Sequence, residues 1–244
     1  MKRGLIKARK RAPQVKALLE QDTTPQEIGL LAQQGVYEFH NDPLMLYRKN
    51  VIEKISANLS LSQQSEIVQK RVRKVLENYY DKPILLGKKI IQLNRGDEGY
   101  PKPILINYDN YTFNLYAAID CIFKEHDGTS HILDFKTCKS DFDKRQAYIY
   151  LLAAKYLYPK HEAVASFYNL ETGVPSDVII ATSNQVKAML KQLIKISKKH
   201  QSQLKDYWRN KQEFNQIFLP HPGLPCRYCP FNSICELSTI EVSA

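Results

Sequence analysis

The sequence predicts an α/β sandwich in which helices flank a mixed sheet. The first observation is the order of elements along residues 62–210: a helix, three strands, a helix, two strands and a long helix. The second is composition, because 43% hydrophobic residues in a chain of 244 can bury a sizeable core. The third is that no apolar run approaches the ~18 residues of a membrane span, and the N-terminus carries no apolar signal region. We therefore expect a soluble, cytoplasmic protein without a membrane partner.

The helices are predicted from end signals and from apolar spacing. Thr24 and Glu27 form a capping box with Pro25 at the first helical position, and Gly35 can end the short helix that begins there. A turn around residues 41–43 follows. Further helices are predicted, from apolar residues at helical spacing, over residues 62–80, 141–158 and 184–210.

The strands are predicted from runs rich in β-branched and aromatic residues. These runs cover residues 84–93, 111–125, 131–137, 163–169 and 177–181. Asp127-Gly128 is a strong hairpin turn, so the first three strands should form an antiparallel meander. A turn containing Gly173 separates the last two strands.

The charge balance predicts a polyanionic partner. Lys and Arg number 35 against 25 Asp and Glu, which gives a formal net charge of +10 and a pI of about 9.2. Nucleic acid is the first candidate, because neutralising its phosphates releases condensed counterions. Seven basic residues precede the first acidic one, Glu20, so residues 1–20 are predicted to be a flexible basic arm. Residues 21–236 would form the main domain, and residues 237–244 a tail.

Two acidic residues and a lysine are the candidate catalytic groups. In a strand, Asp134 and Lys136 project from one face while Phe135 points into the core. The predicted hairpin brings Asp120, which interrupts an apolar run, alongside them. Two carboxylates near one point make an oxygen-rich site suited to Mg²⁺ or Mn²⁺. Such a metal could support phosphodiester hydrolysis, with Lys136 holding the nucleophile or a phosphate oxygen; the alternative is a structural Asp–Lys pair on an exposed strand.

These residues resemble the core of the PD-(D/E)XK nuclease superfamily, in its RecB-like branch. The resemblance rests on the pattern I-D-x-I-F at residues 119–123 and H-I-L-D-F-K-T at residues 131–137, separated by the hairpin. It implies a restriction-endonuclease-like α/β core. It also implies that Asp120 and Asp134 bind the metal together with the backbone carbonyl of Phe135, and that Lys136 takes part in cleavage.

A second motif agrees with this resemblance, and a third departs from it. Gln146 and Tyr150 lie four residues apart on one helical face, as does a Q-x-x-x-Y pair that is thought to position substrate in RecB-like nucleases. The family's earlier helix usually carries G-x-x-x-H-x-x-L-E, whose His is a further metal ligand. Gln69 and Arg73 replace the Gly and the His. Arginine is always a donor and cannot ligate a cation, but Arg73 could hold a phosphate of the substrate.

Three cysteines near the C-terminus predict a second metal centre. Cys226, Cys229 and Cys235 have the spacing C-x2-C-x5-C and resemble part of the iron–sulfur staple of RecB-like nucleases. The fourth cysteine of that staple has no counterpart upstream, where His40 and Asp42 stand. A [4Fe-4S] cluster, a Cys3His zinc site completed by His40 or His221, and a metal-free remnant are the alternatives.

The predicted function is that of a metal-dependent deoxyribonuclease acting on single- or double-stranded DNA in repair, recombination or defence, with other proteins of those pathways as potential partners. The alternative is a nuclease-fold protein that binds nucleic acid or scaffolds a complex without hydrolysing it. RNA is an alternative substrate.

Overall fold

The computed structural model describes residues 18, 24–137, 142–211, 214–219, 222–223, 226, 229 and 231–235. Residues 24–197 form one compact unit, and residues 1–23 with 198–244 form the other. Apart from Leu18, the predicted arm of residues 1–20 lies outside the described residues, as does the tail of residues 237–244. No described helix is both long enough and apolar enough to cross a membrane.

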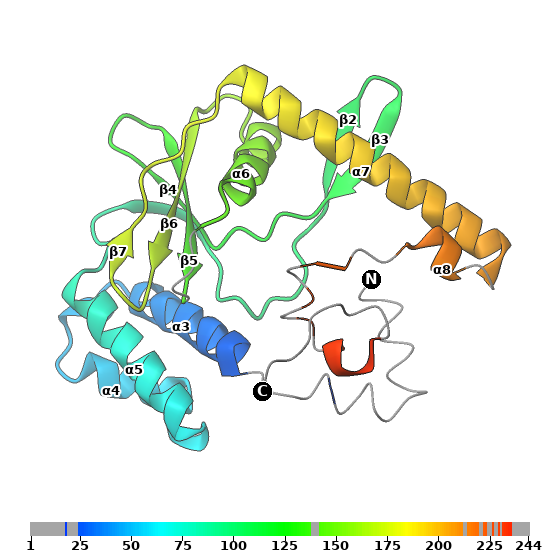
Figure 1. Ribbon diagram of the computed structural model, residues 1–244. Coiled ribbons are helices and arrows are strands. Elements are labelled where there is room, and N and C mark those ends of the chain that lie inside the picture. The colour runs from blue at the N-terminus through cyan, green and yellow to red at the C-terminus, as the bar shows by residue number, and fades with distance from the viewer. Residues whose placement is uncertain are drawn as a thin grey trace. The chain divides into compact units, whose positions relative to one another are not determined.

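The unit of residues 24–197 is built on a mixed five-stranded sheet (Figure 1). In spatial order its strands are β1 (Lys89–Leu93), β4 (Cys121–Lys124), β5 (Ser130–Lys136), β6 (Ala163–Asn169) and β7 (Val174–Pro175). The β1–β4, β4–β5 and β6–β7 pairs are antiparallel, whereas β5 and β6 are parallel. The predicted mixed sheet and the antiparallel arrangement of its first three strands are therefore confirmed.

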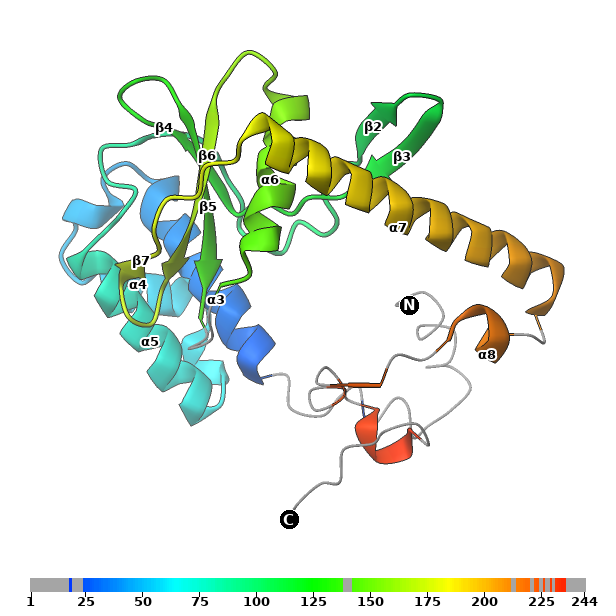
Figure 2. The same cartoon turned by 45° about the horizontal axis from the view of Figure 1, so that its top comes forward.

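Helices cover both faces of this sheet, as Figures 1 and 2 show. Three helices pack on one face: α3 (Thr24–Asn41), α4 (Val51–Asn58) and α5 (Glu66–Asp81). The other face is covered by α6 (Lys144–Leu157) and by the first part of α7 (Ser183–Arg209). Side chains alternate along β5, so Leu133 and Phe135 enter the first layer of core and Ile132 enters the second. Because β5 is buried on both faces, it is a rigid support for polar residues at its end.

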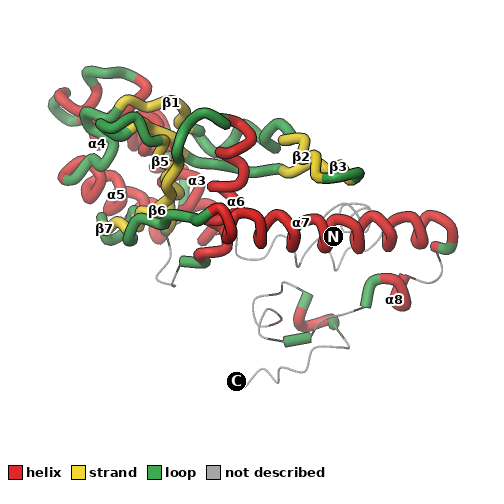
Figure 3. The backbone as a smooth tube through the Cα atoms, turned by 90° about the horizontal axis from the view of Figure 1, so that it is seen from above, coloured by secondary structure: helices red, strands yellow, loops and turns green. Residues whose placement is uncertain are grey.

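The remaining elements are short. A separate two-stranded hairpin is formed by β2 (Ile104–Tyr108) and β3 (Tyr111–Leu115), and Figure 3 shows it apart from the five-stranded sheet. Single turns of 3-10 helix occur at η1 (Met45–Tyr47), η2 (Leu61–Gln63) and η5 (Asn232–Ile234), and α8 (Phe214–Ile217) is a single α-helical turn.

Three predicted strands differ from the observed ones. The run 111–125 divides into β3 and β4, because β3 pairs with β2, a strand that was not predicted, and residues 116–120 lead from the hairpin to the sheet. Within 84–93 only β1 is a strand, because the chain turns after Pro83 and Gly87 adopts a positive φ. Within 177–181 only Ile179 pairs, in a bridge to Ala165.

Gly35 does not end its helix as predicted, since α3 continues to Asn41. The glycine is buried in the middle of α3, and a Cβ atom at this position would collide with the side chain of Leu76 on α5. The missing side chain therefore lets two core helices approach closely. Here packing, rather than chain termination, explains the glycine.

We expect Gly35→Ala to lower the free energy of unfolding by about 1–3 kcal/mol, the usual cost of an overpacked core. Urea denaturation would measure it. Gly29→Ala, on the same helix, is the matched control: its nearest new contact, at 3.4 Å from Thr137 Oγ1, is ordinary packing. Because alanine favours a helix over glycine, that control should be neutral or stabilising. Equal stability of the two variants would contradict the packing argument.

Candidate active site

The site begins with a buried carboxylate at the end of β5. Asp134 is only 3% exposed. It shares a face of the strand with Lys136, whose Nζ lies 2.5 Å from Asp134 Oδ2. A carboxylate held in the interior is costly unless it is paired and hydrogen-bonded. The lysine supplies the charge, and its side chain remains one-quarter exposed, so the pair lies at the boundary of solvent.

The second carboxylate belongs to Asp120, the residue just before β4. The antiparallel register pairs Cys121 with Leu133, which brings Asp120 beside the last residues of β5. Its Oδ2 accepts a hydrogen bond of 2.8 Å from the backbone N–H of Phe135. The N–H and C=O of a strand residue point to the same edge, so the Phe135 carbonyl faces the side of β5 on which Asp120 lies.

Two residues of α6 hold Asp134 in place. Gln146 donates to Asp134 Oδ1 at 3.2 Å and accepts from Lys136 at 3.2 Å, so its amide bridges the ion pair. The hydroxyl of Tyr150 lies 2.8 Å from Asp134 Oδ1 and 2.9 Å from the carbonyl of Ala118, and it accepts from Gln146 at 2.7 Å. The i, i+4 pair predicted from sequence is thus assembled with the catalytic candidates.

The surroundings of Asp120 disturb its titration. Burial and the nearby charge of Asp134 raise the pKa of Asp120, while the N–H of Phe135, then Lys136, and a hydrogen bond from Gln33 oppose the rise. Burial and Asp134 also raise the pKa of Tyr150, so it remains a neutral donor. Two neighbouring negative charges repel each other, so the site favours a cation.

The residues present fit a divalent metal ion. Among the described residues Asp134 Oδ2 has no hydrogen-bond donor of suitable geometry, although it is buried and in ion-pair contact with Lys136. Asp120 and Asp134 would hold the ion, with the Phe135 carbonyl on the same side. Mg²⁺ is commonly bound through one or two carboxylates, with water and substrate phosphate completing its shell. The described part of the chain has no group of three or more His, Cys, Asp and Glu placed to hold a metal.

Sequence reasoning missed the contribution of α3 to this site. Gln33 hydrogen-bonds Asp120, and its amide also donates to the carbonyl of Asn94 at 3.1 Å. Asn94 in turn donates its backbone N–H to Asp120 O (2.8 Å) and its side-chain amide to Ile119 O (2.7 Å). The available signal was a pair of glutamines in an otherwise apolar helical stretch; the neighbouring Gln34 is buried and bonds Asp97 at 3.0 Å.

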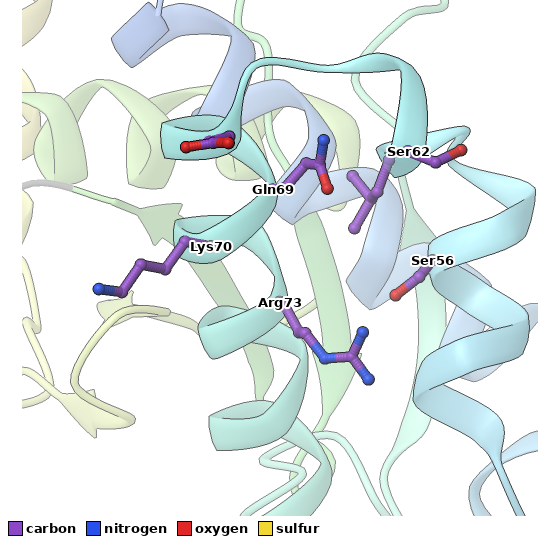
Figure 4. Close-up of a pocket in the computed structure, with 7 residues that line it drawn as sticks. Ser56, Ser62, Gln69, Lys70 and Arg73 are labelled. Atoms are coloured by element: carbon purple, nitrogen blue, oxygen red, sulfur yellow. The ribbon is translucent and has the colours of Figure 1, made fainter.

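Arg73 makes its contacts elsewhere. It pairs with Glu53 of α4 at 2.8 Å and with Glu77 of its own helix at 3.6 Å. It lines a pocket of ≈ 390 Å³ between these helices, together with Lys70 (Figure 4). Two positions earlier, on another side of α5, Arg71 instead contacts the Thr137 carbonyl just beyond Lys136. The structure thus gives Arg73 no contact with Asp120, Asp134 or Lys136.

The C-terminal cysteines belong to the other compact unit. Cys226, Cys229 and Cys235 are free thiols, and backbone turns link them: Cys229 N–H donates to Cys226 O at 3.1 Å, and Gly223 N–H approaches Cys226 Sγ at 3.4 Å. His221 lies outside the described residues.

The two candidate upstream ligands have partners within the unit of residues 24–197. His40 Nε2 lies 2.7 Å from the Tyr79 hydroxyl, and burial lowers the pKa of His40 to about 4. Asp42 pairs with Arg48 at 2.5 Å.

The comparisons with known proteins identify the family of this chain. The family model of the PD-(D/E)XK nuclease superfamily matches residues 7–236, and the chain belongs to that superfamily. No curated protein matches the chain at a significant level. Among solved structures eight chains match, including the crystal structure of SSO0001, which is 13% identical, with 84% of this chain and 94% of that chain covered and a TM-score of 0.34.

Tyr150→Phe should lower the free energy of unfolding by about 1–3 kcal/mol, because the buried Asp134 carboxylate and the Ala118 carbonyl lose the one hydroxyl proton that lies between them. It should also weaken Mn²⁺ binding, measured by titration calorimetry. Tyr148→Phe is the control on the same helix: its hydroxyl accepts an exposed hydrogen bond from Gln185 at 3.3 Å. We expect that change to stay within about 0.5 kcal/mol. Similar losses in both variants would show that Tyr150 has no special role.

Metal binding should release a proton. Because the pKa of Asp120 is raised in the fold, the metal-free native state binds more protons than the unfolded chain between the ordinary carboxyl pKa and the raised one. Its stability should therefore fall as pH rises through that window, whereas affinity for Mg²⁺ or Mn²⁺ should rise. Calorimetry in buffers of different ionisation enthalpy counts the released proton. Asp120→Asn should abolish the release; an unchanged proton count would assign the titration elsewhere.

Proposed function

We propose that this protein is a metal-dependent deoxyribonuclease that hydrolyses phosphodiester bonds of DNA. The observation that carries the proposal is the buried Asp134, held beside Asp120 and paired with Lys136 at the solvent boundary. Superfamily membership supports nuclease chemistry, and the motifs of the chain favour its RecB-like branch. The net charge of +10 favours a polyanionic substrate.

Each residue of the site has a distinct role in this proposal. Asp120, Asp134 and the Phe135 carbonyl hold Mg²⁺ or Mn²⁺. The bound ion supplies Lewis acidity and lowers the pKa of water. Lys136 places a positive charge where the attacking oxygen and the phosphate meet, and it stabilises the negative charge that develops there. Gln146 and Tyr150 are positioning residues, because both hydrogen-bond Asp134 and Gln146 also accepts from Lys136.

A binding or scaffolding protein is the second candidate. The observation that favours it is Arg73, which occupies the place of a family metal ligand and pairs with Glu53 instead. A nuclease without that ligand would hold its metal with the two carboxylates and the Phe135 carbonyl. The retention of Asp120, Asp134 and Lys136 together favours hydrolysis, since binding alone gives no chemical reason for two neighbouring carboxylates beside a lysine. DNA repair, recombination and defence are the processes that suit this activity. Other proteins of these processes are its potential partners.

We expect purified protein to cleave labelled single- or double-stranded DNA with Mg²⁺ or Mn²⁺ and not with EDTA. Asp120→Ala, Asp134→Ala and Lys136→Ala should each lower the rate by at least about a hundredfold, because each removes a charge at the reacting phosphate. DNA binding should persist, since it is spread over many basic residues. Asp81→Ala, an exposed carboxylate at the end of α5, is the control. Absence of metal-dependent cleavage of both DNA and RNA would favour the binding or scaffolding protein. Cleavage by the Asp134→Ala variant would show that the active site lies elsewhere.

We also propose that Cys226, Cys229 and Cys235 bind a metal, as a [4Fe-4S] cluster or as zinc. The support is three soft ligands within ten residues and an N–H directed at the sulfur of Cys226. Protein purified without air should be brown with labile sulfide if it holds a cluster, or colourless with stoichiometric zinc. Cys229→Ser should release the metal and lower the melting temperature, whereas Cys121→Ser, at a buried thiol of the sheet, should retain it. Protein free of both metals would mark the cysteines as a remnant.

A further inference from the structure

The first part of α7 carries an uncompensated row of lysines. Lys187, Lys191 and Lys195 recur every four residues, so they share one side of the helix. All three are exposed. The rise of an α-helix separates neighbours by about 6 Å and the outer two by about 12 Å. Between Ser183 and Lys205 the sequence contains no Asp or Glu, so no acid on that stretch of the helix neutralises the row.

Several basic side chains elsewhere in the unit do have acidic partners. Arg71 pairs with Glu171, Lys88 with Glu125, and Arg145 with Asp143. Within the described part of the chain, Lys187, Lys191 and Lys195 make no ion pair. Their charge is therefore available to a partner.

A neighbouring side of α7 fixes the row in place. Met189, Leu190 and Ile194 are buried in the same layer of core as Tyr150 of the candidate site. Two surface hydrogen bonds add to this anchoring, from Gln185 to the Tyr148 hydroxyl at 3.3 Å and between the Tyr111 hydroxyl and Ser197 at 3.0 Å. A membrane-surface helix needs a free apolar side, but here that side is occupied. A polyanion is the partner that the exposed side fits.

We propose that the row formed by Lys187, Lys191 and Lys195 is a docking surface for the sugar–phosphate backbone of nucleic acid, separate from the carboxylate site. A duplex carries one negative charge per ≈ 1.7 Å of axis with both strands counted, so each strand offers about three or four phosphates along the 12 Å of the row. Lysines bind phosphate as point charges without reading bases, so this contact is independent of sequence. The inference deepens the proposed function by giving its substrate a contact outside the reacting phosphate.

The test compares two variants that lose the same charge. The first is the triple variant Lys187→Gln, Lys191→Gln and Lys195→Gln, in which glutamine keeps the helix propensity. The matched control is Lys49→Gln, Lys54→Gln and Lys74→Gln, at exposed positions around α4 and α5 on the other side of the sheet. Circular dichroism confirms folding. Anisotropy of a fluorescein-labelled duplex of about 30 base pairs, longer than the row, gives affinity in EDTA at several salt concentrations.

We expect the α7 variant to bind the duplex about tenfold more weakly at moderate salt. Its plot of log affinity against log salt should become shallower by up to about 0.9 per lysine. The control should change affinity by less than about twofold. Equal losses of affinity in both variants would show that only the net charge matters. Unchanged affinity in the α7 variant would show that the row is not a docking surface. Wild-type protein that binds labelled polyglutamate as tightly as the duplex would assign the row to an acidic protein instead.

This outcome is separable from that of the proposed function, because binding in EDTA needs no cleavage. Protein that cleaves nothing, yet loses binding in the α7 variant, would overturn the nuclease and keep the docking surface. Protein that cleaves DNA, with equal binding by wild type and the α7 variant, would keep the nuclease and overturn the docking surface.

Discussion

The structure depends on one constraint, the need to satisfy a carboxylate inside the protein. Asp134 is almost fully buried, and a charge there is stable only with partners supplied by more than one element. Lys136 comes from the same strand, while Gln146 and Tyr150 come from α6. The contacts that satisfy Asp134 therefore also set the position of α6 on the sheet.

The second carboxylate extends this dependence to the opposite face of the sheet. Asp120 takes one hydrogen bond from the backbone of β5 and another from Gln33 of α3. Arg71 of α5 bonds the Thr137 carbonyl just beyond Lys136 and pairs with Glu171 after β6. The end of β5 is therefore held from both layers of helices. Such support keeps charged groups from relaxing away from one another, which preorganised electrostatic catalysis requires.

Local periodicity explains what could be predicted from the sequence. The alternation of a strand places Asp134 and Lys136 together, and the turn of a helix does the same for Gln146 and Tyr150. What could not be predicted depends on packing between distant segments. Gln33 reaches Asp120 only because α3 crosses the end of the sheet. Gly35 lies within α3 and not at its end, and it is a glycine because Leu76 of α5 occupies the space that a Cβ atom would need. Nor could the sequence show that Arg73, expected to hold a phosphate of the substrate, pairs with Glu53 of α4.

Phe135 makes the site tolerant of one kind of evolutionary change and intolerant of another. Its ring belongs to the core, and its contribution to the site is its backbone, the N–H to Asp120 and the carbonyl on the same edge. Apolar replacements of similar volume can therefore accumulate at this position without altering the chemistry. Insertion of one residue into β5 would instead exchange the faces of the following side chains. Over evolutionary time the length of this strand should thus be kept more strictly than the identity of the residue at position 135.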